Sequence, residues 1–246
     1  MPRLIPLLMS VTAIASLSVA NAADKTDATA VVKKGIEFLG GEKNLKKFKA
    51  ATWKDKGTYY GMGDGLAYTG KFATVWPGKF RMEILGVFTQ VLNVDSGWVN
   101  SMGNVKDMTK KQVAAQQQSQ HETFVGQLYP LLDGKKYKLT LDGKAEVNGG
   151  KAAIVKVKSK GNRDIRLFFN PKTGELVKSE FMATPADLSD KLVKQETYFK
   201  AYRAVKGIKY ASKIRIMRGG KKYIETTITE YKPLDSLPEK TFAKPK

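Results

Sequence analysis

The sequence predicts an α+β domain built from one antiparallel sheet and two helical segments. Three observations carry this prediction. Apolar residues alternate with polar ones over most of the chain after residue 50, as on half-buried strands. Short turns rich in Gly, Pro and Asp separate these runs, and two segments show helical spacing instead. No repeat and no Pro- or Ser-rich linker divides the chain, so we expect residues 23–246 to form a single domain.

The first 22 residues predict a secretory signal peptide. Arg3 supplies a positive start, residues 4–19 are mainly apolar, and Ala20-Asn21-Ala22 has the small-x-small pattern of a cleavage site. A membrane anchor is the alternative, but Pro6 and several Ser and Thr residues leave the run too short and too interrupted. We therefore expect cleavage after Ala22.

The period of the apolar residues predicts each element in turn. Residues 27–39 are expected to form a helix that ends at Gly40-Gly41, followed by a short helical turn over 42–48. Turns are expected at residues 61–65, 77–78, 95–97, 170–174 and 219–220. About ten strands are expected, within residues 53–60, 66–76, 80–85, 88–94, 98–102, 136–143, 152–159, 164–183, 194–218 and 221–232.

A second helix is expected over residues 109–132, where the period of two is lost. Its first half reads KKQVAAQQQSQHE and is almost wholly polar, whereas Phe124, Leu128, Leu131 and Leu132 make its second half apolar. A helix with so little apolar surface at its start is expected to be held loosely there.

Composition narrows the function. The chain of 246 residues has 43 Lys and Arg against 23 Asp and Glu, and the 224 residues after the signal peptide carry a net charge of +19. In an exported protein this charge favours anionic head groups, anionic glycans or an acidic protein over nucleic acid, although it also serves solubility alone. The sequence contains no Cys, which excludes disulfides, thiolate catalysis and Cys-ligated metals.

Catalytic motifs are not evident. His121 is the only His and stands in a polar helical stretch, where a solvated side chain is the ordinary outcome. Asp64 and Asp95 belong to Gly-containing turns, and Glu83 and Glu180 are expected to face solvent beside basic neighbours. No HExxH, G-x-S-x-G or P-loop pattern occurs. We therefore expect no enzyme, no metal site and no cofactor.

Aromatic residues on strands leave two possibilities open. They could fill the core of the sheet, which is the ordinary role of Trp, Phe and Tyr. A curved sheet closed by helices can also enclose an apolar groove for a ligand.

The segment WPGKFRMEI, residues 76–84, resembles the outer-membrane lipoprotein carrier superfamily, whose members are called LolA-like. The turn DSGW at 95–98, the closing Leu-Asp-x-Leu-Pro-x-x-x-Phe segment at 234–242 and the opening FLGGEKNLKKFKA at 38–50 agree with this resemblance. It implies an incomplete antiparallel β-barrel closed by N-terminal and central helices, with an apolar cavity for acyl chains. It also implies a periplasmic location in a Gram-negative type of envelope.

The resemblance assigns a set of candidate site residues. The apolar cavity is expected to be lined by Trp76, Phe80, Met82, Phe88, Trp98, Phe124 and Leu128, with Arg81 as a head-group contact. Trp76 and Phe80 would flank the hairpin at the cavity mouth, with Phe124 and Leu128 opposite as part of a lid. Well-studied carriers have an Arg before the Pro that ties the lid to the barrel, and Trp76 cannot make that charge-assisted contact.

The leading prediction is a periplasmic carrier or chaperone, expected to be a monomer, that binds the acyl chains of a lipoprotein or lipid. It would also meet an anionic membrane surface. The alternative is a basic module with a filled core that binds anionic membranes or glycans. An enzyme on a carrier-like scaffold is the weakest of the three.

Overall fold

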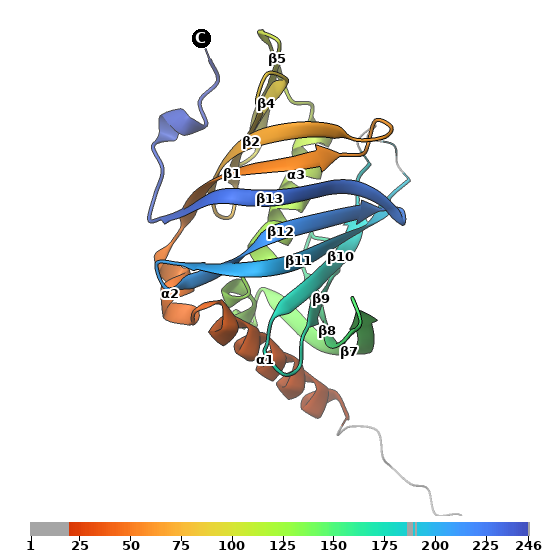
Figure 1. The fold of residues 1–246 in the computed structure, drawn as a ribbon. Helices are drawn as coiled ribbons and strands as arrows, with labels where there is room; N and C mark the ends of the chain where they lie inside the picture. The colour runs from red at the N-terminus through yellow and green to blue at the C-terminus, as the bar shows by residue number, and fades with distance from the viewer. Residues whose placement is uncertain (1–19, 186–188, 190, 246) are drawn as a thin grey trace, which may run out of the picture.

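The computed structural model describes residues 20–185, 189 and 191–245, with side chains from Ala28 onward (Figure 1). Its dominant feature is one antiparallel sheet of thirteen strands. The strands are β1 (Ala50–Tyr59), β2 (Leu66–Val75), β3 (Lys79–Ile84), β4 (Phe88–Asn93), β5 (Ser96–Ser101), β6 (Asn104–Asp107), β7 (Tyr137–Val147), β8 (Gly150–Ser159), β9 (Ile165–Phe169), β10 (Leu176–Ala183), β11 (Val193–Val205), β12 (Ile208–Arg218) and β13 (Lys221–Leu234). The helical elements are α1 (Ala20–Leu39), α2 (Glu42–Lys47), α3 (Lys110–Val125) and two 3₁₀ turns, η1 (Tyr129–Leu132) and η2 (Glu239–Thr241).

The sheet consists of two meanders joined through one strand pair. Strands β1 to β6 are neighbours in sequence order, as are β7 to β13, and β1 pairs with β13. Hairpins explain this order, because short turns can link only antiparallel neighbours. The β1–β13 pair is therefore the one long-range strand contact that makes the two meanders a single sheet.

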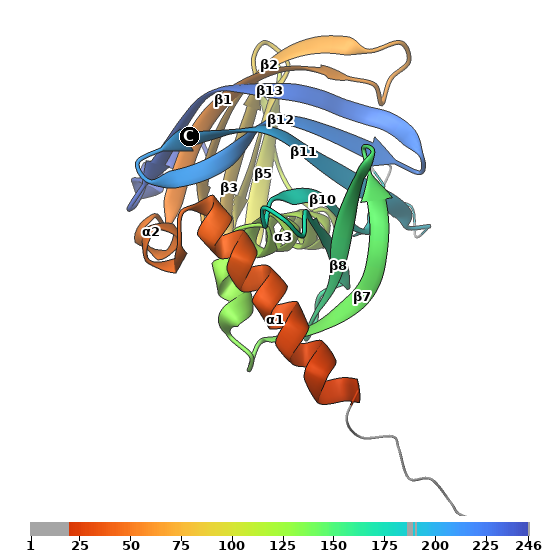
Figure 2. The same cartoon turned by 60° about the horizontal axis from the view of Figure 1, so that its bottom comes forward.

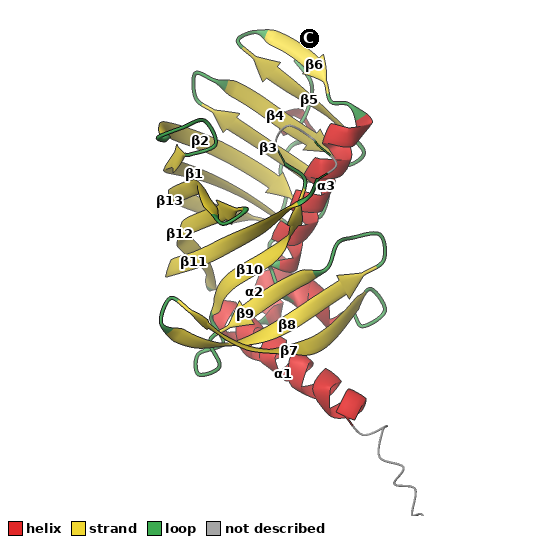
Figure 3. Cartoon of the chain, turned by 90° about the vertical axis from the view of Figure 1, so that its right-hand side faces the viewer, coloured by secondary structure: helices red, strands yellow, loops and turns green. Residues whose placement is uncertain are grey.

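The sheet curves around α3 and α1, which lie on its inner face (Figures 2 and 3). The strand register assigns each side chain to a face, because directly paired residues point the same way. Gln90 belongs to the inner face, since its amide donates to Gln116 of α3 at 2.8 Å. The inner face of β1 to β4 follows from this: Trp53 pairs with Phe72, Phe72 with Met82, and Met82 with Gln90.

The main core lies between α1 and the inner face of the second meander. Val32 and Ile36 of α1 pack in one buried cluster with residues of β7 to β10 such as Val155 and Leu167. Gly35 permits this approach, because a Cβ there would lie 2.8 Å from side-chain atoms of both Leu128 and Phe169. At the end of α1, Gly40 takes φ +119° beside the β11–β12 turn, a conformation that glycine adopts readily.

A smaller core lies on the outer face of the first meander. The closing segment of the chain crosses this face, and Phe242 packs there with Ala73, Val91 and Trp98. The indole Nε1 of Trp98 donates to the carbonyl of Phe242 at 3.3 Å. The closing segment therefore covers the outer side of β2, β4 and β5.

The fold class is α+β with an open, curved antiparallel sheet, as the sequence predicts. The predicted turns at 61–65, 77–78, 170–174 and 219–220 all separate strands, whereas the turn expected at 95–97 lies at residues 94–95, because β5 already begins at Ser96. The short strand β6 was not predicted, and the region 194–218 is a hairpin that turns at Lys206-Gly207 rather than one run.

Two helical predictions are corrected. Helix α1 begins at Ala20, earlier than the expected Asp27, and so includes the predicted cleavage sequence. The expected helix 109–132 ends at Val125, because Leu128 takes φ +61° and breaks the helical path before η1. Residues 1–19, the remainder of the predicted signal peptide, lie outside the described residues.

Candidate functional site on the inner face

A stack of aromatic rings lies on the inner face of the first meander. Trp53 and Phe72 are parallel, with ring centroids 5.0 Å apart, and Phe80 is tilted 6.2 Å from Trp53 and 6.3 Å from Phe72. All three are half-buried, unlike the residues of the main core. We call Trp53, Phe72 and Phe80 the inner aromatic stack.

Aliphatic side chains extend the inner aromatic stack across the sheet. Met82, Ile84 and Phe88 share its face on β3 and β4, and all are half-buried. On the other side, Ile216 and Ile224 pair directly and are also half-buried. The inner face therefore keeps a broad apolar surface partly uncovered, where the second meander is covered by α1.

A polar cluster interrupts this apolar surface. The Asp55 carboxylate is 4% exposed and accepts hydrogen bonds from Thr226 Oγ1 at 2.8 Å and Tyr68 Oη at 3.3 Å. Burial raises the pKa of Asp55, although both hydroxyl donors act against that shift. Burial also raises the pKa of the Tyr68 phenol, so its hydroxyl stays a hydrogen-bond donor at neutral pH. Both donors reach Oδ2 of this carboxylate, and its Oδ1 is buried without a hydrogen-bond partner.

Helix α3 crosses the inner face and is held mainly by polar contacts. Besides the Gln90–Gln116 bond, Gln117 Nε2 donates to the Val94 carbonyl at 3.0 Å. At the other meander, Ser179 Oγ donates to Glu122 at 2.6 Å, and burial raises the pKa of that carboxyl.

Few side chains of α3 are fully buried. They are Val113, Gln120 and Val125. Helices usually bury a continuous apolar stripe, so α3 is held with less apolar packing than is usual, in agreement with its polar sequence.

Three of the predicted cavity residues come together on the inner face. Phe80 belongs to the inner aromatic stack, and Met82 and Phe88 lie beside it on neighbouring strands. Phe124 near the end of α3 is half-buried and meets Tyr129 edge to face, with centroids 6.2 Å apart. Trp76 follows β2 and is half-buried, with an indole Nε1 that has no hydrogen-bond partner.

The structure does not group the other predicted residues with them. Trp98 is 5% exposed on the outer face, under Phe242, and Arg81 pairs with Val91 on that same face. The Arg81 guanidinium lies 5.9 Å from the Trp98 ring and binds Glu83 at 3.1 Å. Leu128 is fully buried against α1 rather than opposite Trp76.

Trp53 and Phe72 were missed as site residues. Both lie within predicted strands, but only the pairing of β1 with β2 and of β2 with β3 shows that their side chains point to the same face as Phe80. These two residues could therefore be found only from the strand-pairing register, and not from the composition of either strand.

The lone His and one acid differ from expectation. His121 is half-buried, its Nε2 lies 3.1 Å from Ser159 Oγ, and its ring stacks on Tyr137. Burial lowers the pKa of His121. Glu180 is 8% exposed instead of solvent-facing, because Arg166 and Lys178 bind it at 2.7 and 2.9 Å. Glu180 is therefore held in the sheet by two ion pairs, and His121 by its contacts with Ser159 and Tyr137.

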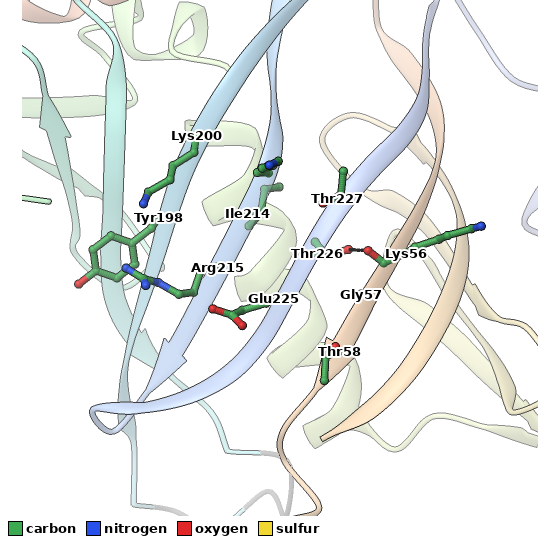
Figure 4. Close-up of a pocket in the computed structure, with 11 residues that line it drawn as sticks. Lys56, Gly57, Thr58, Tyr198, Lys200, Ile214, Arg215, Glu225, Thr226 and Thr227 are labelled. Carbon is green, nitrogen blue, oxygen red and sulfur yellow. Dashed lines mark hydrogen bonds between the residues drawn. The ribbon is translucent and has the colours of Figure 1, made fainter. Parts of the chain in front are cut away.

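A cavity of about 380 Å³ lies on the outer face instead, across β1, β11, β12 and β13 (Figure 4). Its lining is polar and mainly basic, with Lys200, Lys213 and Arg215 against the single carboxylate of Glu225. The Arg215 guanidinium lies 4.8 Å from the Tyr198 ring. This cavity suits a small anion better than an acyl chain.

The open curved sheet with helices on its inner face places the protein in a known structural class, the LolA-like fold. Its structure is similar to a LolA superfamily protein from Nitrosomonas europaea, with a TM-score of 0.56 and 10% identity over 88% of this chain and 97% of that chain. It is also similar to a putative outer membrane lipoprotein-sorting protein domain from Vibrio parahaemolyticus, with a TM-score of 0.57 and 11% identity over 89% and 97% of the two chains. A DUF1329 family protein from Desulfovibrio piger gives a TM-score of 0.58 and 11% identity over 88% and 97%.

These similarities concern the fold, since the identities are near 10%. No protein-family model matches the sequence, and no curated protein sequence matches it. Among the described residues, no helix is both long and apolar enough to span a membrane.

Proposed function

We propose that the protein is a periplasmic carrier that holds the acyl chains of a lipid or lipoprotein against the inner face of the sheet, beneath α3. The observation that carries this proposal is the half-buried inner aromatic stack with its aliphatic neighbours. Apolar surface left partly exposed costs free energy in water, and each methylene buried against it contributes about 0.8 kcal/mol. A carrier needs such a surface and no catalytic group.

The position of α3 supports the proposal. The helix spans from β4 to β10 through hydrogen bonds that water can replace, such as Gln90–Gln116 and Ser179–Glu122. A cover held in this way can separate from the sheet at lower cost than one held by a large apolar core. In this role Phe124 and Trp76 would meet the ligand at the edges of the apolar surface.

The LolA-like fold is the second support. One similar structure is titled an outer membrane lipoprotein-sorting protein domain, which suggests an acylated ligand for this chain as well. The predicted signal peptide and the fold together favour the periplasm, and the absence of a recognised catalytic motif favours a carrier over an enzyme.

The test measures binding of a fluorescent fatty-acid probe to two matched variants. Phe80→Ala removes a ring of the inner aromatic stack, and we expect a several-fold loss of affinity with a modest loss of stability. Trp98→Ala removes a larger aromatic ring from the outer face, and we expect it to lower the free energy of unfolding by about 3–5 kcal/mol with unchanged affinity per folded molecule. Equal affinities for Phe80→Ala and the unmodified protein would rule out the inner site.

The second candidate function is the binding of anionic glycans or head groups, favoured by the basic outer cavity. Organic extraction of the purified protein followed by mass spectrometry separates the two. Co-purified lipid supports the carrier. A lipid-free extract, together with salt-sensitive binding to an anionic glycan that Lys200→Gln weakens, supports the second function.

A further inference from the structure

The large apolar side chains that the described residues expose are concentrated at one end of the sheet. In a meander, every second turn lies at the same end of the strands. The β1–β2, β3–β4 and β5–β6 turns therefore share one end, and they lie along one edge of the sheet in Figure 3. These turns carry five exposed apolar side chains, which we call the apolar rim: Met62, Leu66, Leu85, Val87 and Met102.

The exposure of the apolar rim is high. Met102 is 93% exposed, Met62 73% and Val87 55%. Met182 and Leu192, beside the β10–β11 connection, are exposed at the same end of the strands. Only Val94 of the exposed large apolar residues described lies at the opposite end. Singly exposed apolar residues are ordinary, but this segregation to one end is not.

We propose that the apolar rim docks on a bilayer of anionic phospholipids. The apolar side chains stand on the tips of three separate hairpins, one or two to a tip and beside Gly86 and Gly103, rather than in one groove. Neighbouring hairpins are about 10 Å apart, from two strand spacings. Separate tips of this kind suit a fluid interface, into which each side chain can insert independently.

Cations accompany the apolar rim. Lys221 and Lys222 form the start of β13, next to the β1–β2 connection, and the Lys222 ammonium lies 5.4 Å from the Tyr60 ring. Lys106 is exposed close to the β5–β6 turn. Lysines around inserted apolar side chains attract anionic head groups, an attraction that salt screens. Charge complementarity therefore favours an anionic bilayer over a neutral one.

The apolar rim is continuous with the inner face. Leu66 pairs with Tyr59 on the inner face, and Ile84 and Phe88 of that face directly flank the rim residues Leu85 and Val87. A rim seated on a bilayer would bring the edge of the inner apolar surface to the membrane. Docking itself does not depend on the proposed carrier function, although ligand exchange at this edge would rest on it.

The first test uses the Cys-free sequence for site-specific labelling. Met102→Cys carries an environment-sensitive fluorophore on the apolar rim, and Val94→Cys carries it at the opposite end. With vesicles containing phosphatidylglycerol, we expect a blue shift from position 102 and none from position 94. Equal shifts at both positions, or none at either, overturn the proposal. A concentration-dependent shift without vesicles also overturns it and identifies a second copy of the chain as the occupant.

The second test is vesicle flotation of unlabelled variants. We expect Met62→Ser/Val87→Ser/Met102→Ser to lose about tenfold in the fraction bound to phosphatidylglycerol vesicles, since burying each of these side chains is what holds the protein. Val94→Ser is the matched control and should bind as the unmodified protein does. Phe80→Ala should also bind vesicles normally, so failure of the carrier function and failure of docking are distinguishable. Unchanged flotation of the triple variant contradicts the proposal.

Discussion

Asp55 shows how much a single residue depends on its neighbours in the sheet. Its place in a polar strand of alternating pattern, TWKDKG, indicates an ordinary exposed acid. The structure instead buries it on the inner face under Tyr68 and Thr226, with hydroxyl donors and no cation. Since burial dominates, its pKa is raised, and the carboxylate is a cost to stability at neutral pH.

We predict that Asp55→Asn gains stability relative to the unmodified protein as the pH rises. An unfolded Asp titrates at about 3.9, whereas the folded group holds its proton to higher pH. The contribution of Asp55 to stability is therefore most favourable below the pKa of the unfolded Asp. This contribution is lost as the pH rises through the raised pKa of Asp55 in the folded protein. Asn does not titrate and keeps an acceptor for both hydroxyls.

Urea unfolding at pH 3.5 and pH 7.5 measures this effect. The difference in unfolding free energy, variant minus unmodified, should be more positive at pH 7.5. Asp95→Asn, in an exposed turn, is the matched control for the chemical change from carboxylate to amide. A difference that is the same at both pH values for Asp55→Asn contradicts a raised pKa.

At the same scale, the candidate site was only partly predictable from the sequence. Phe80, Met82 and Phe88 were assigned together by the resemblance, and the β3–β4 register places them on one face. Trp98 was assigned to the cavity but lies on the outer face, as does Arg81, since the face of a residue follows from the register of its strand and not from the strand's own composition. A one-residue change of register exchanges the two faces, and nothing within β5 specifies which face Phe242 covers.

At the scale of elements, α3 depends on its first turn. Thr109 is the N-cap, and its side chain accepts from the Gln112 backbone while the Gln112 side chain accepts from the Thr109 backbone, which forms a capping box. With few apolar side chains buried, this cap is a large part of what holds the start of the helix.

We predict that Thr109→Ala loosens the first half of α3. The loss of the cap should cost about 1 kcal/mol, and backbone amides of residues 110–117 should exchange hydrogen faster. Thr123→Ala, at an exposed site of the same helix, is the matched control, and its exchange should be unchanged or slower because Ala favours helix. If Thr109→Ala leaves the exchange of these amides unchanged, α3 is held by its tertiary contacts and not by its cap.

The elements themselves were more predictable than their ends. Periodicity and Gly-containing turns located most strands, because hairpin turns are local chemistry. The end of α3 was not predictable, since Leu128 continues the apolar pattern of the helix and yet takes a positive φ to reach the core beside Gly35. Packing against α1, which lies far away in the sequence, decides that conformation.

At the scale of the whole molecule, the pairing of β1 with β13 joins the two meanders, and α1 closes the second. From Ala28 onward, α1 buries Ala28, Val32 and Ile36 against the sheet. Lys34 Nζ donates to the Pro171 carbonyl at 2.7 Å, and Gly174 packs against the Lys34 backbone.

We predict from this that the exported protein begins near Ala23 and keeps its full stability. The motive is the apolar run of residues 4–19 followed by Ala20-Asn21-Ala22, which has the pattern of a cleaved leader. A chain that starts at Ala23 keeps every contact of α1 from Ala28 onward, so its melting temperature should equal that of a chain that retains residues 20–22. Intact-mass measurement of the exported protein gives the start, and thermal unfolding of the two purified forms gives the comparison. An exported form that retains the apolar leader contradicts cleavage, and a lower melting temperature for the shorter form shows that the first turn of α1 contributes to the fold.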